Sequence, residues 1–520
     1  MRNAIPMFLA AAVLAPAAAH AELPAEQAKT CAALKDLART DLVIDKAEAV
    51  SAGPVQVPMY RLEVPVPDHC LVRGRLDPRK GVDGRDYAIG FEVRLPAAWN
   101  GRFLFQGGGG LDGRVMPALG LSPGGAPGLA RGFAVVSTDA GHEGDDASFA
   151  ADQQARLDYA YAALGKVTAE AKGVVIRYYG KPAQYSYFAG CSNGGRQGMM
   201  AAQRYPDQFD GILAGDPGFR LSRAAIGEAW DTRQFLKVAP KGPDGKPVLA
   251  QAFSEEELKL VSDAVLKQCD ALDGLADGMI NDVKACHFDV KVLQCKSGQA
   301  QAKGCLSKEK IEALAAVQGG AHDSKGRKLY SGWYYDAGMA DQGWRFWKLT
   351  LNASLGFDSL TRYFSTPQLH IDGPSGFDFD KLEEQTAQTG AVNDPVSTYL
   401  TSFTARGSRL MIYQGVSDPV FSAEDIVGWY DKLNEDNGDM HDSVRLFLIP
   451  GMGHCMGGPA TDRFDALSAL QDWVEKHQAP DRITAQGQAF PGVTRPLCAY
   501  PKVARYQGGD ASSEASFSCR

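Results

Sequence analysis

The chain has 520 residues, of which 45% are hydrophobic, and its formal net charge is −8. A single hydrophobic core rarely serves so long a chain, so we expect a main domain with a second domain or a large insertion. The sequence lacks the basic clusters that nucleic-acid binding needs, so nucleic acid is not an expected partner.

The first residues have the pattern of a signal peptide. Arg2 precedes an apolar stretch from Ile5 to Ala18, and the small-residue site Ala19-His20-Ala21 follows. We predict that residues 1–21 are removed and that the mature protein is secreted or periplasmic. The apolar stretch is too short and too rich in alanine to span a bilayer, and no membrane anchor is expected elsewhere.

All the cysteines follow the predicted cleavage site, and an even number of them in an exported chain favours disulfide bonds. Zinc is the alternative, but the sequence has no C-x-x-C pair. The spacing of the cysteines does not fix their pairing. The ten residues are Cys31, Cys70, Cys191, Cys269, Cys286, Cys295, Cys305, Cys455, Cys498 and Cys519.

Short strands and helices alternate along the first 218 residues and again after residue 406. This alternation is typical of a parallel sheet joined by right-handed crossovers. Strands are expected at 91–95, 102–105, 132–137, 185–189, 209–214, 409–413 and 444–449, and helices at 152–179, 195–205 and 461–477.

Residues 219–406 interrupt the alternation. They are rich in loops, hold four of the cysteines and concentrate six aromatic residues in one short span, namely Trp333, Tyr334, Tyr335, Trp344, Phe346 and Trp347. We predict that this segment is a lid domain inserted into a catalytic domain formed by residues 22–218 and 407–520.

The sequence Gly190-Cys191-Ser192-Asn193-Gly194-Gly195 lies between an expected strand and an expected helix. A sharp turn at such a place holds a serine hydroxyl out of the sheet at the positive end of the helix, and glycines on either side avoid clashes. This context favours Ser192 as a nucleophile over the alternative, an ordinary glycine-rich turn.

A serine nucleophile needs a base and an acid that orients the base. In the α/β-hydrolase fold the three follow in the order Ser, Asp, His. Asp418 and His454 each come directly after one of the late expected strands. Taken alone, Asp418 also suits a turn or a helix cap, and His454 a buried structural role. Together with Ser192 they predict a catalytic triad on an α/β-hydrolase fold, whereas His142 precedes the serine and is interpreted as structural.

Acyl transfer also needs hydrogen-bond donors for the developing oxyanion. The glycines at 107–110 follow an expected strand and expose backbone amides without side chains. Gly108 or Gly109 is one expected donor, and the amide of Asn193 is the second. A phosphate-binding loop is the alternative, but its Lys-Ser/Thr ending is missing.

Cys191 and Cys455 are the direct neighbours of the expected nucleophile and base. If Ser192 and His454 touch, the two sulfurs lie within bonding distance, and a disulfide would clamp the serine turn to the histidine loop. The alternative is two unrelated buried thiols.

An acidic loop in the predicted lid is a candidate cation site. The carboxylates of Asp270, Asp273 and Asp277 are interspersed with glycines, and the carbonyls of Leu275 and Met279 could complete a shell of oxygen ligands. Ca²⁺ prefers such ligands from a bent loop. A solvated acidic turn is the alternative.

On these motifs the chain resembles the tannase and feruloyl esterase family. The resemblance rests on residues 190–195, Ser417-Asp418-Pro419, Gly453-His454-Cys455 and the acidic loop, and it spans nearly the whole mature chain. It implies a structural calcium ion in that loop. It also implies five disulfides, which pair Cys191 with Cys455, Cys31 with Cys70, Cys269 with Cys286, Cys295 with Cys305 and Cys498 with Cys519.

Members of this family cleave esters of aromatic acids, so the resemblance implies a small-molecule aromatic ester as the substrate. Phe421 resembles a family position that packs on the substrate ring. The aromatic span fits a slot for a planar ring, with the core of the lid as the alternative role for its members. Familiar members have threonine after the nucleophile, and Asn193 in its place bears on substrate fit alone.

The sequence therefore predicts a carboxylic ester hydrolase that acts on feruloyl, galloyl or terephthaloyl esters through an acyl-enzyme. A short-chain aliphatic esterase or a peptidase is the alternative with the same chemistry. A non-catalytic binding protein on the same fold is the alternative from another class, and the intact triad argues against it.

Overall fold

The computed structural model of the chain describes residues 23–57, 61–296 and 304–520, so the predicted signal peptide lies outside the described residues. A nine-stranded sheet forms the centre, in the order β1-β4-β5-β7-β6-β8-β9-β10-β11. Its strands are β1 (Leu42–Val50), β4 (His69–Lys80), β5 (Asp86–Pro96), β6 (Arg102–Gln106), β7 (Ala134–Thr138), β8 (Tyr185–Cys191), β9 (Gly211–Gly215), β10 (Arg409–Gly415) and β11 (Val444–Ile449).

The sheet is mixed, whereas the sequence analysis expected a parallel one. Neighbouring strands from β7 through β6, β8, β9 and β10 to β11 run parallel, while β1, β4 and β5 are antiparallel to their neighbours. A short turn joins β4 to β5, and an antiparallel pair of strands needs no crossover helix. The first two, β1 and β4, were not predicted.

Helices account for most of the remaining regular structure. They are α1 (Ala25–Ala32), α2 (Gln153–Leu157), α3 (Ala163–Tyr179), α4 (Asn193–Arg204), α5 (Leu221–Leu236), α6 (Glu255–Cys269), α7 (Lys308–Gln318), α8 (Gln342–Leu349), α9 (Leu355–Asp358), α10 (Phe379–Asn393), α11 (Thr401–Thr404), α12 (Ala423–Asn437) and α13 (Ala466–Lys476). The expected helix at 152–179 is divided by a π-helical turn at Asp158–Ala162. The expected helix at 461–477 begins only at Ala466.

The side chains of each central strand alternate between two hydrophobic cores, one on each face of the sheet. Phe105 and Ile412 belong to one core, and their neighbours Leu104 and Met411 belong to the other, where Trp473 of α13 packs. All five residues are fully buried. Burial of one such side chain contributes about 1.5–3 kcal/mol, so helices on both faces hold the central strands in place.

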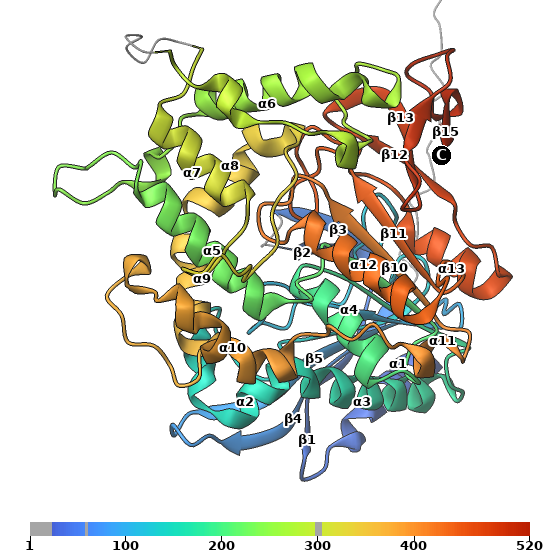
Figure 1. Cartoon of the computed structure of the whole chain (residues 1–520). Helices are drawn as coiled ribbons and strands as arrows, with labels where there is room; N and C mark the ends of the chain where they lie inside the picture. Colours follow the sequence, from blue (N-terminus) through green and yellow to red (C-terminus); the bar gives the residue numbers. More distant parts are fainter. Residues whose placement is uncertain (1–22, 58–60, 297–303) are drawn as a thin grey trace, which may run out of the picture.

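Between β9 and β10, the described residues contain no strand of the main sheet, and part of them packs around a third core. This third core joins Phe235 of α5, Val261 of α6, Leu314 of α7 and Trp344 of α8. Figure 1 shows α5 to α8, in green to yellow, gathered in the upper left of the molecule, away from the antiparallel strands β1 and β4 at the bottom. We call residues 219–406 the helical segment.

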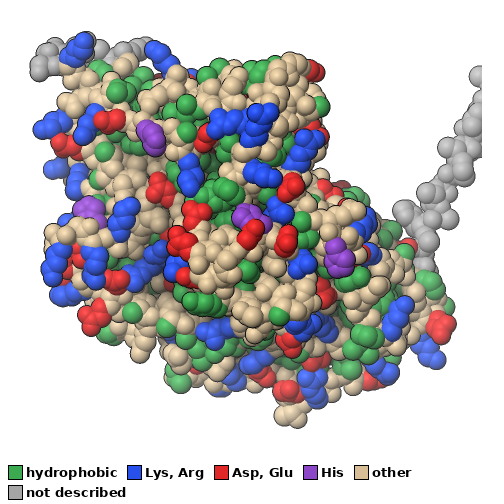
Figure 2. Space-filling view, turned by 45° about the vertical axis from the view of Figure 1, so that its right-hand side comes forward, with side chains coloured by type: hydrophobic (Ala, Val, Ile, Leu, Met, Phe, Trp, Pro, Cys, Tyr) green, Lys and Arg blue, Asp and Glu red, His purple; other side chains and the backbone are tan. Residues whose placement is uncertain are grey.

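Four further small strands close the chain. They form the hairpins β12 (Arg482–Gly487) with β13 (Phe490–Cys498) and β14 (Ala504–Tyr506) with β15 (Phe517–Cys519). Near the amino terminus, β2 (Gly53–Val57) pairs with β3 (Leu62–Val66). On the face seen in Figure 2, acidic and basic side chains are interspersed. In the described part of the chain, no helix is both long and apolar enough to cross a membrane.

Candidate active site

Ser192 occupies a strained turn between β8 and α4. Its backbone has φ 64° and ψ −126°, a region that residues with a Cβ rarely adopt. The turn also needs glycine at its close contacts. A Cβ on Gly194 would lie 2.6 Å from the carbonyl oxygen of Gly108, and one on Gly190 would lie 2.8 Å from Gly194. The serine hydroxyl is thereby held at the amino-terminal end of α4.

The structure brings together the three residues that the sequence analysis named as a triad. His454 Nε2 lies 2.8 Å from Ser192 Oγ, and His454 Nδ1 lies 2.9 Å from Asp418 Oδ2. Both distances are those of hydrogen bonds. The three residues come from the loops after β8, β10 and β11, which are strands of the parallel part of the sheet.

Asp418 is fixed by hydrogen bonds as well as by burial. Its side chain is 1% exposed. Its Oδ1 accepts the backbone amides of Val420 at 2.7 Å and Phe421 at 3.2 Å, and its Oδ2 accepts the side-chain amide of Gln414 at 3.2 Å. These donors hold the carboxylate facing the imidazole and compensate its negative charge in the protein interior.

The five predicted disulfides are all present in the described residues. Cys191 is bonded to Cys455, so a covalent bond joins the residue before Ser192 to the residue after His454. The four other predicted pairs are confirmed as well, at Cys31 with Cys70, Cys269 with Cys286, Cys295 with Cys305 and Cys498 with Cys519.

The expected oxyanion donors Gly108 and Gly109 lie in a loop that packs on the serine turn, but both amides have protein partners. Gly108 N donates to Gln197 Oε1 at 2.9 Å, and Gly109 N donates to Asp112 Oδ1 at 3.0 Å. The role of these glycines therefore stays a prediction. A tetrahedral intermediate would have to share or replace one of these hydrogen bonds.

Asp112 joins the glycine loop to the first turns of α4. Its Oδ2 accepts the side-chain amides of Asn193 and Gln197, both at 2.8 Å. The side chain of Asn193 also accepts a hydrogen bond from Arg196 at 2.6 Å, so it points into this network. Loss of water around its carboxyl raises the pKa of Asp112 to about 7, although the charge of Arg196 acts in the opposite direction.

Two aromatic rings stand against the imidazole of His454. The ring of Phe421 lies 5.4 Å from that of His454 at an angle of 74°, and the ring of Trp347, from α8, lies 5.3 Å away at 72°. Of the other aromatic residues in the predicted slot, Trp333 and Trp344 are buried. Among the described residues of the aromatic span, Trp347 is the one whose ring contacts the imidazole.

The acidic loop of the helical segment is held by protein donors. The carboxylate of Asp270 accepts the amide of Gly278 at 2.9 Å, and that of Asp277 pairs with Arg495 of β13 at 2.5 Å. Burial raises the pKa of Asp270 and of Asp273, and the negative charge of Asp277 adds to both. Within the described residues, the three carboxylates do not each bring an oxygen within 4.8 Å of the others.

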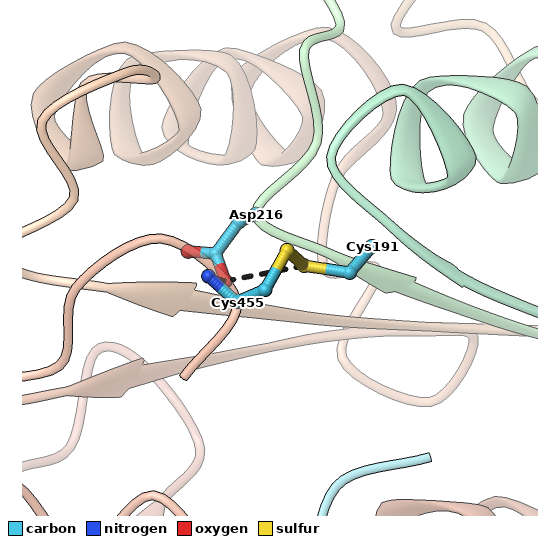
Figure 3. A group of neighbouring side chains, drawn as sticks. All are labelled: Cys191, Asp216 and Cys455. Atoms are coloured by element: carbon cyan, nitrogen blue, oxygen red, sulfur yellow. Dashed lines mark hydrogen bonds between the residues drawn. A yellow bond between two sulfur atoms is a disulfide. The ribbon is translucent and has the colours of Figure 1, made fainter. Parts of the chain in front are cut away.

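Several residues around the site were not found by sequence reasoning. Asp112 and Gln197 carry no motif of their own, although Asp112 follows the glycine run by two residues. Asp216, which touches the Cys191–Cys455 disulfide (Figure 3), follows β9 directly but belongs to no known spacing pattern.

His142, which the sequence led us to interpret as structural, is buried. Its ring stacks on that of Phe149 with ring centroids 3.9 Å apart, and burial lowers its pKa to about 4.

Comparison with known proteins identifies the family. The model of the family described as "Tannase and feruloyl esterase" matches residues 70–520. The chain belongs to the tannase and feruloyl esterase family. It is 39% identical to a mono(2-hydroxyethyl) terephthalate hydrolase of Piscinibacter sakaiensis, over 96% of this chain and 92% of that protein. It is 29% identical to a probable feruloyl esterase B-1 of Aspergillus fumigatus, over 82% of each chain. The chain is thus a carboxylic ester hydrolase.

Solved structures share the fold of this esterase. The crystal structure of feruloyl esterase B from Aspergillus oryzae superposes with a TM-score of 0.81 at 24% identity, over 95% of this chain and all of the other. A tannin acyl hydrolase from Aspergillus niger gives a TM-score of 0.73 at 22% identity, over 96% of both chains. The whole architecture, with its helical segment, therefore has counterparts of known structure.

We expect Asp112→Asn to change how stability depends on pH. The carboxyl has a pKa of about 7 in the folded chain and an ordinary value of 3.8, so the folded state binds more protons between these values. The free energy of unfolding of the wild type should therefore fall, relative to that of the variant, as the pH rises from about 4 to about 7. Urea unfolding at several pH values measures the difference.

The same variant should lower kcat about tenfold, because an amide cannot accept all three hydrogen bonds that hold the glycine loop. Asp139→Asn is the matched control. This aspartate is buried, accepts the amides of Gly90 and Gly141, and burial raises its pKa to about 8. It should alter the pH dependence of stability but leave kcat unchanged. Equal kcat for the wild type and Asp112→Asn would contradict the expectation.

Proposed function

We propose that this esterase is a serine hydrolase that cleaves esters of aromatic acids through an acyl-enzyme on Ser192. The observation that supports it most directly is the continuous hydrogen-bonded chain from Ser192 through His454 to Asp418. A serine hydroxyl is a weak nucleophile until a base takes its proton, and this geometry supplies that base.

The proposed reaction has two steps. Ser192 Oγ attacks the ester carbonyl carbon while its proton passes to His454 Nε2, and Asp418 holds the proton on Nδ1 and stabilises the imidazolium. The C–O bond to the alcohol then breaks, and the alcohol leaves with the proton from Nε2. In the second step, His454 takes a proton from water, which attacks the carbonyl carbon of the acyl-enzyme. The bond from that carbon to Ser192 Oγ breaks, His454 returns the proton to Oγ, and the carboxylic acid is released. The amide of Asn193 and an amide of Gly108 or Gly109 stabilise the oxyanion in both steps.

The aromatic acyl group is proposed from the family relatives and from the rings beside the imidazole. Trp347 and Phe421 flank His454, so an acyl ring bound next to Ser192 would meet aromatic neighbours. The relatives named above hydrolyse a terephthalate ester or carry the name of feruloyl esterases. Feruloyl, galloyl and terephthaloyl esters are thus the substrates to test.

We further propose that the fold is an α/β-hydrolase and that the helical segment is its lid. Part of the segment packs around a third hydrophobic core, and the segment is inserted between β9 and β10. Trp347 of α8 reaches His454 from it. Asp336, also in the segment, accepts hydrogen bonds from Ser417 Oγ and from Gly451 N, both at 2.7 Å. These contacts support a lid that is joined to the loops of the acid and the base.

The reaction is tested with methyl gallate, methyl ferulate, mono(2-hydroxyethyl) terephthalate and a nitrophenyl butyrate. We expect the wild type to turn over at least one aromatic ester faster than the butyrate, and Ser192→Ala to lose kcat by about 10⁵-fold. Ser186→Ala, which removes a serine from the same strand β8, should keep wild-type turnover. Trp347→Ala should raise KM for the aromatic esters more than for the butyrate.

Other outcomes of this panel favour other functions. Faster turnover of the butyrate or of a peptide would favour the aliphatic esterase or the peptidase. Failure of a fluorophosphonate probe to label Ser192, with no turnover of any ester, would favour a binding protein.

We propose a structural calcium ion in the acidic loop, bound by Asp270, Asp273 and Asp277 with the carbonyls of Leu275 and Met279. The donor set is made of hard oxygens. The negative charge of Asp277 adds to the effect of burial on the pKa of Asp270 and of Asp273, and a bound cation would offset that charge. The hydrogen bonds that these carboxylates accept in the structure would rearrange on binding. The ion takes no part in the proposed ester chemistry.

Metal removal tests the calcium proposal without relying on activity. We expect the purified protein to contain calcium by elemental analysis, and EDTA to lower its melting temperature until calcium is added back. Asp273→Asn should be insensitive to EDTA. A protein that contains no calcium and melts at the same temperature with and without EDTA would contradict the proposal.

We propose export of the protein. The pattern of residues 1–21 and the five disulfides support it, because disulfides persist in oxidising compartments. Amino-terminal sequencing of the protein recovered from its native source should begin at Glu22. A mature protein that retains Met1 would rule out this cleavage.

A further inference from the structure

A buried carboxyl with no part in the proposed chemistry lies at the centre of the site. Asp216 follows β9 directly and is 0% exposed. Its φ of +34° lies in the left-handed region, which costs free energy for a residue with a Cβ. Its amide donates to the carbonyl of Tyr413 at 2.8 Å and so continues the pairing of β9 with β10. The strained backbone aims the side chain at the loops that carry the triad.

Each oxygen of this carboxyl accepts a backbone amide from a different segment. Asp216 Oδ1 accepts Gly415 N at 2.6 Å, and Gly415 ends β10, three residues before Asp418. Asp216 Oδ2 accepts Cys455 N at 3.1 Å, and Cys455 follows His454 directly. One side chain thus links the segment that carries Asp418 to the loop that carries His454.

The same carboxyl also contacts Cys191, the residue before Ser192. Its Oδ2 lies 3.5 Å from Cys191 Sγ, and Figure 3 shows it against the disulfide that joins Cys191 to Cys455. The carbonyl of Gly215, the preceding residue, accepts the backbone amide of Ser192 at 3.0 Å. Two cysteines and an aspartate could hold a metal, but these sulfurs are bonded to each other and offer no thiolate.

The carboxyl of Asp216 also lies close enough to Asp418 for the two groups to interact. Burial and the negative charge of Asp418 raise the pKa of Asp216 well above its ordinary value.

We propose that Asp216 is a positioning residue that sets the distances between Ser192, His454 and Asp418 through its contacts with Gly415, Cys455 and the disulfide. It acts through these neighbours and does not touch the substrate. A shift of about 1 Å between reacting groups can cost on the order of 100-fold in rate, so a loss of either hydrogen bond should appear in turnover. The inference rests on the proposed function.

The test is Asp216→Asn, which is neutral and of the same size, and asparagine tolerates a positive φ. Its amide nitrogen cannot accept a hydrogen bond, so either Gly415 N or Cys455 N loses its partner. We expect kcat on the preferred ester to fall roughly 10- to 100-fold with KM within about threefold, and labelling of Ser192 by a fluorophosphonate to slow in parallel. Thiol titration of the denatured variant should show all disulfides intact.

Asp152→Asn is the matched control. Asp152 is buried, and its two oxygens also accept two backbone amides from different segments, those of Ala155 at 2.8 Å and Val82 at 3.1 Å. It lies at the start of α2, and none of its hydrogen bonds involves a triad loop. It should lose at least as much thermal stability as Asp216→Asn but keep kcat. Wild-type kcat in a folded Asp216→Asn, or an equal loss of kcat in both variants, would overturn the proposal.

Hydrogen exchange of the wild type provides a second test if Asp216→Asn does not fold. Single-amide mass spectrometry should show slow exchange at Gly415 and Cys455, since both amides are bonded to a buried carboxyl. Exchange of both amides within seconds at pH 7 would also overturn the proposal. The proposed function is judged separately, because turnover that is lost in Ser192→Ala establishes it whatever Asp216→Asn does.

Discussion

The site depends on four adjacent parallel strands that end at one edge of the sheet. In β8 and β9, Cys191 pairs with Gly215, and in β10 and β11, Gly415 pairs with Ile449, so the chain leaves each strand at nearly the same level. The serine, the buried aspartate, the acid and the base are each carried by the loop that follows one of these strands. A slip of one residue between two strands would turn these side chains to the opposite face.

Alignment of strands places the loops, but the contacts among the loops set their spacing. A disulfide joins the serine turn to the histidine loop, and two buried aspartates bridge the remaining gaps. Asp216 lies directly after β9, and Asp336 lies in the helical segment, where it accepts hydrogen bonds from Ser417 and Gly451. The segment that contains Trp347 is thus joined to the loops of Asp418 and His454. These contacts fix the position of the Trp347 ring relative to the imidazole.

Sequence reasoning found the residues that follow an expected strand and stand in an order typical of one fold. Ser192, Asp418 and His454 each follow a strand, and their order is typical of one fold, so their meeting could be predicted from that order alone. The cysteines beside Ser192 and His454 followed from that meeting. The glycine run likewise lies against the serine turn, as its place after β6 suggested.

Other features depend on contacts between segments far apart in the chain. The direction of β4 and β5 relative to the rest of the sheet is set by turn length and edge packing, which local patterns do not encode. Asp216 has no flanking motif, and its importance appears only when Gly415 and Cys455 are seen to donate to it. Trp347 was one of six aromatic candidates, and packing alone decides which of them reaches the imidazole.

Residues near the carboxyl terminus contact the acidic loop of the helical segment, which lies much earlier in the chain. Arg495 of β13 pairs with Asp277, and Arg505 of β14 bonds the carbonyl of Leu272 at 2.6 Å and also contacts Asp282. A ribosome makes the amino-terminal end first, so the acidic loop waits for more than two hundred further residues before these contacts can form. Cys191 likewise waits for Cys455. The proposed triad therefore cannot assemble until His454 and Cys455 have been made, when nearly the whole chain has emerged.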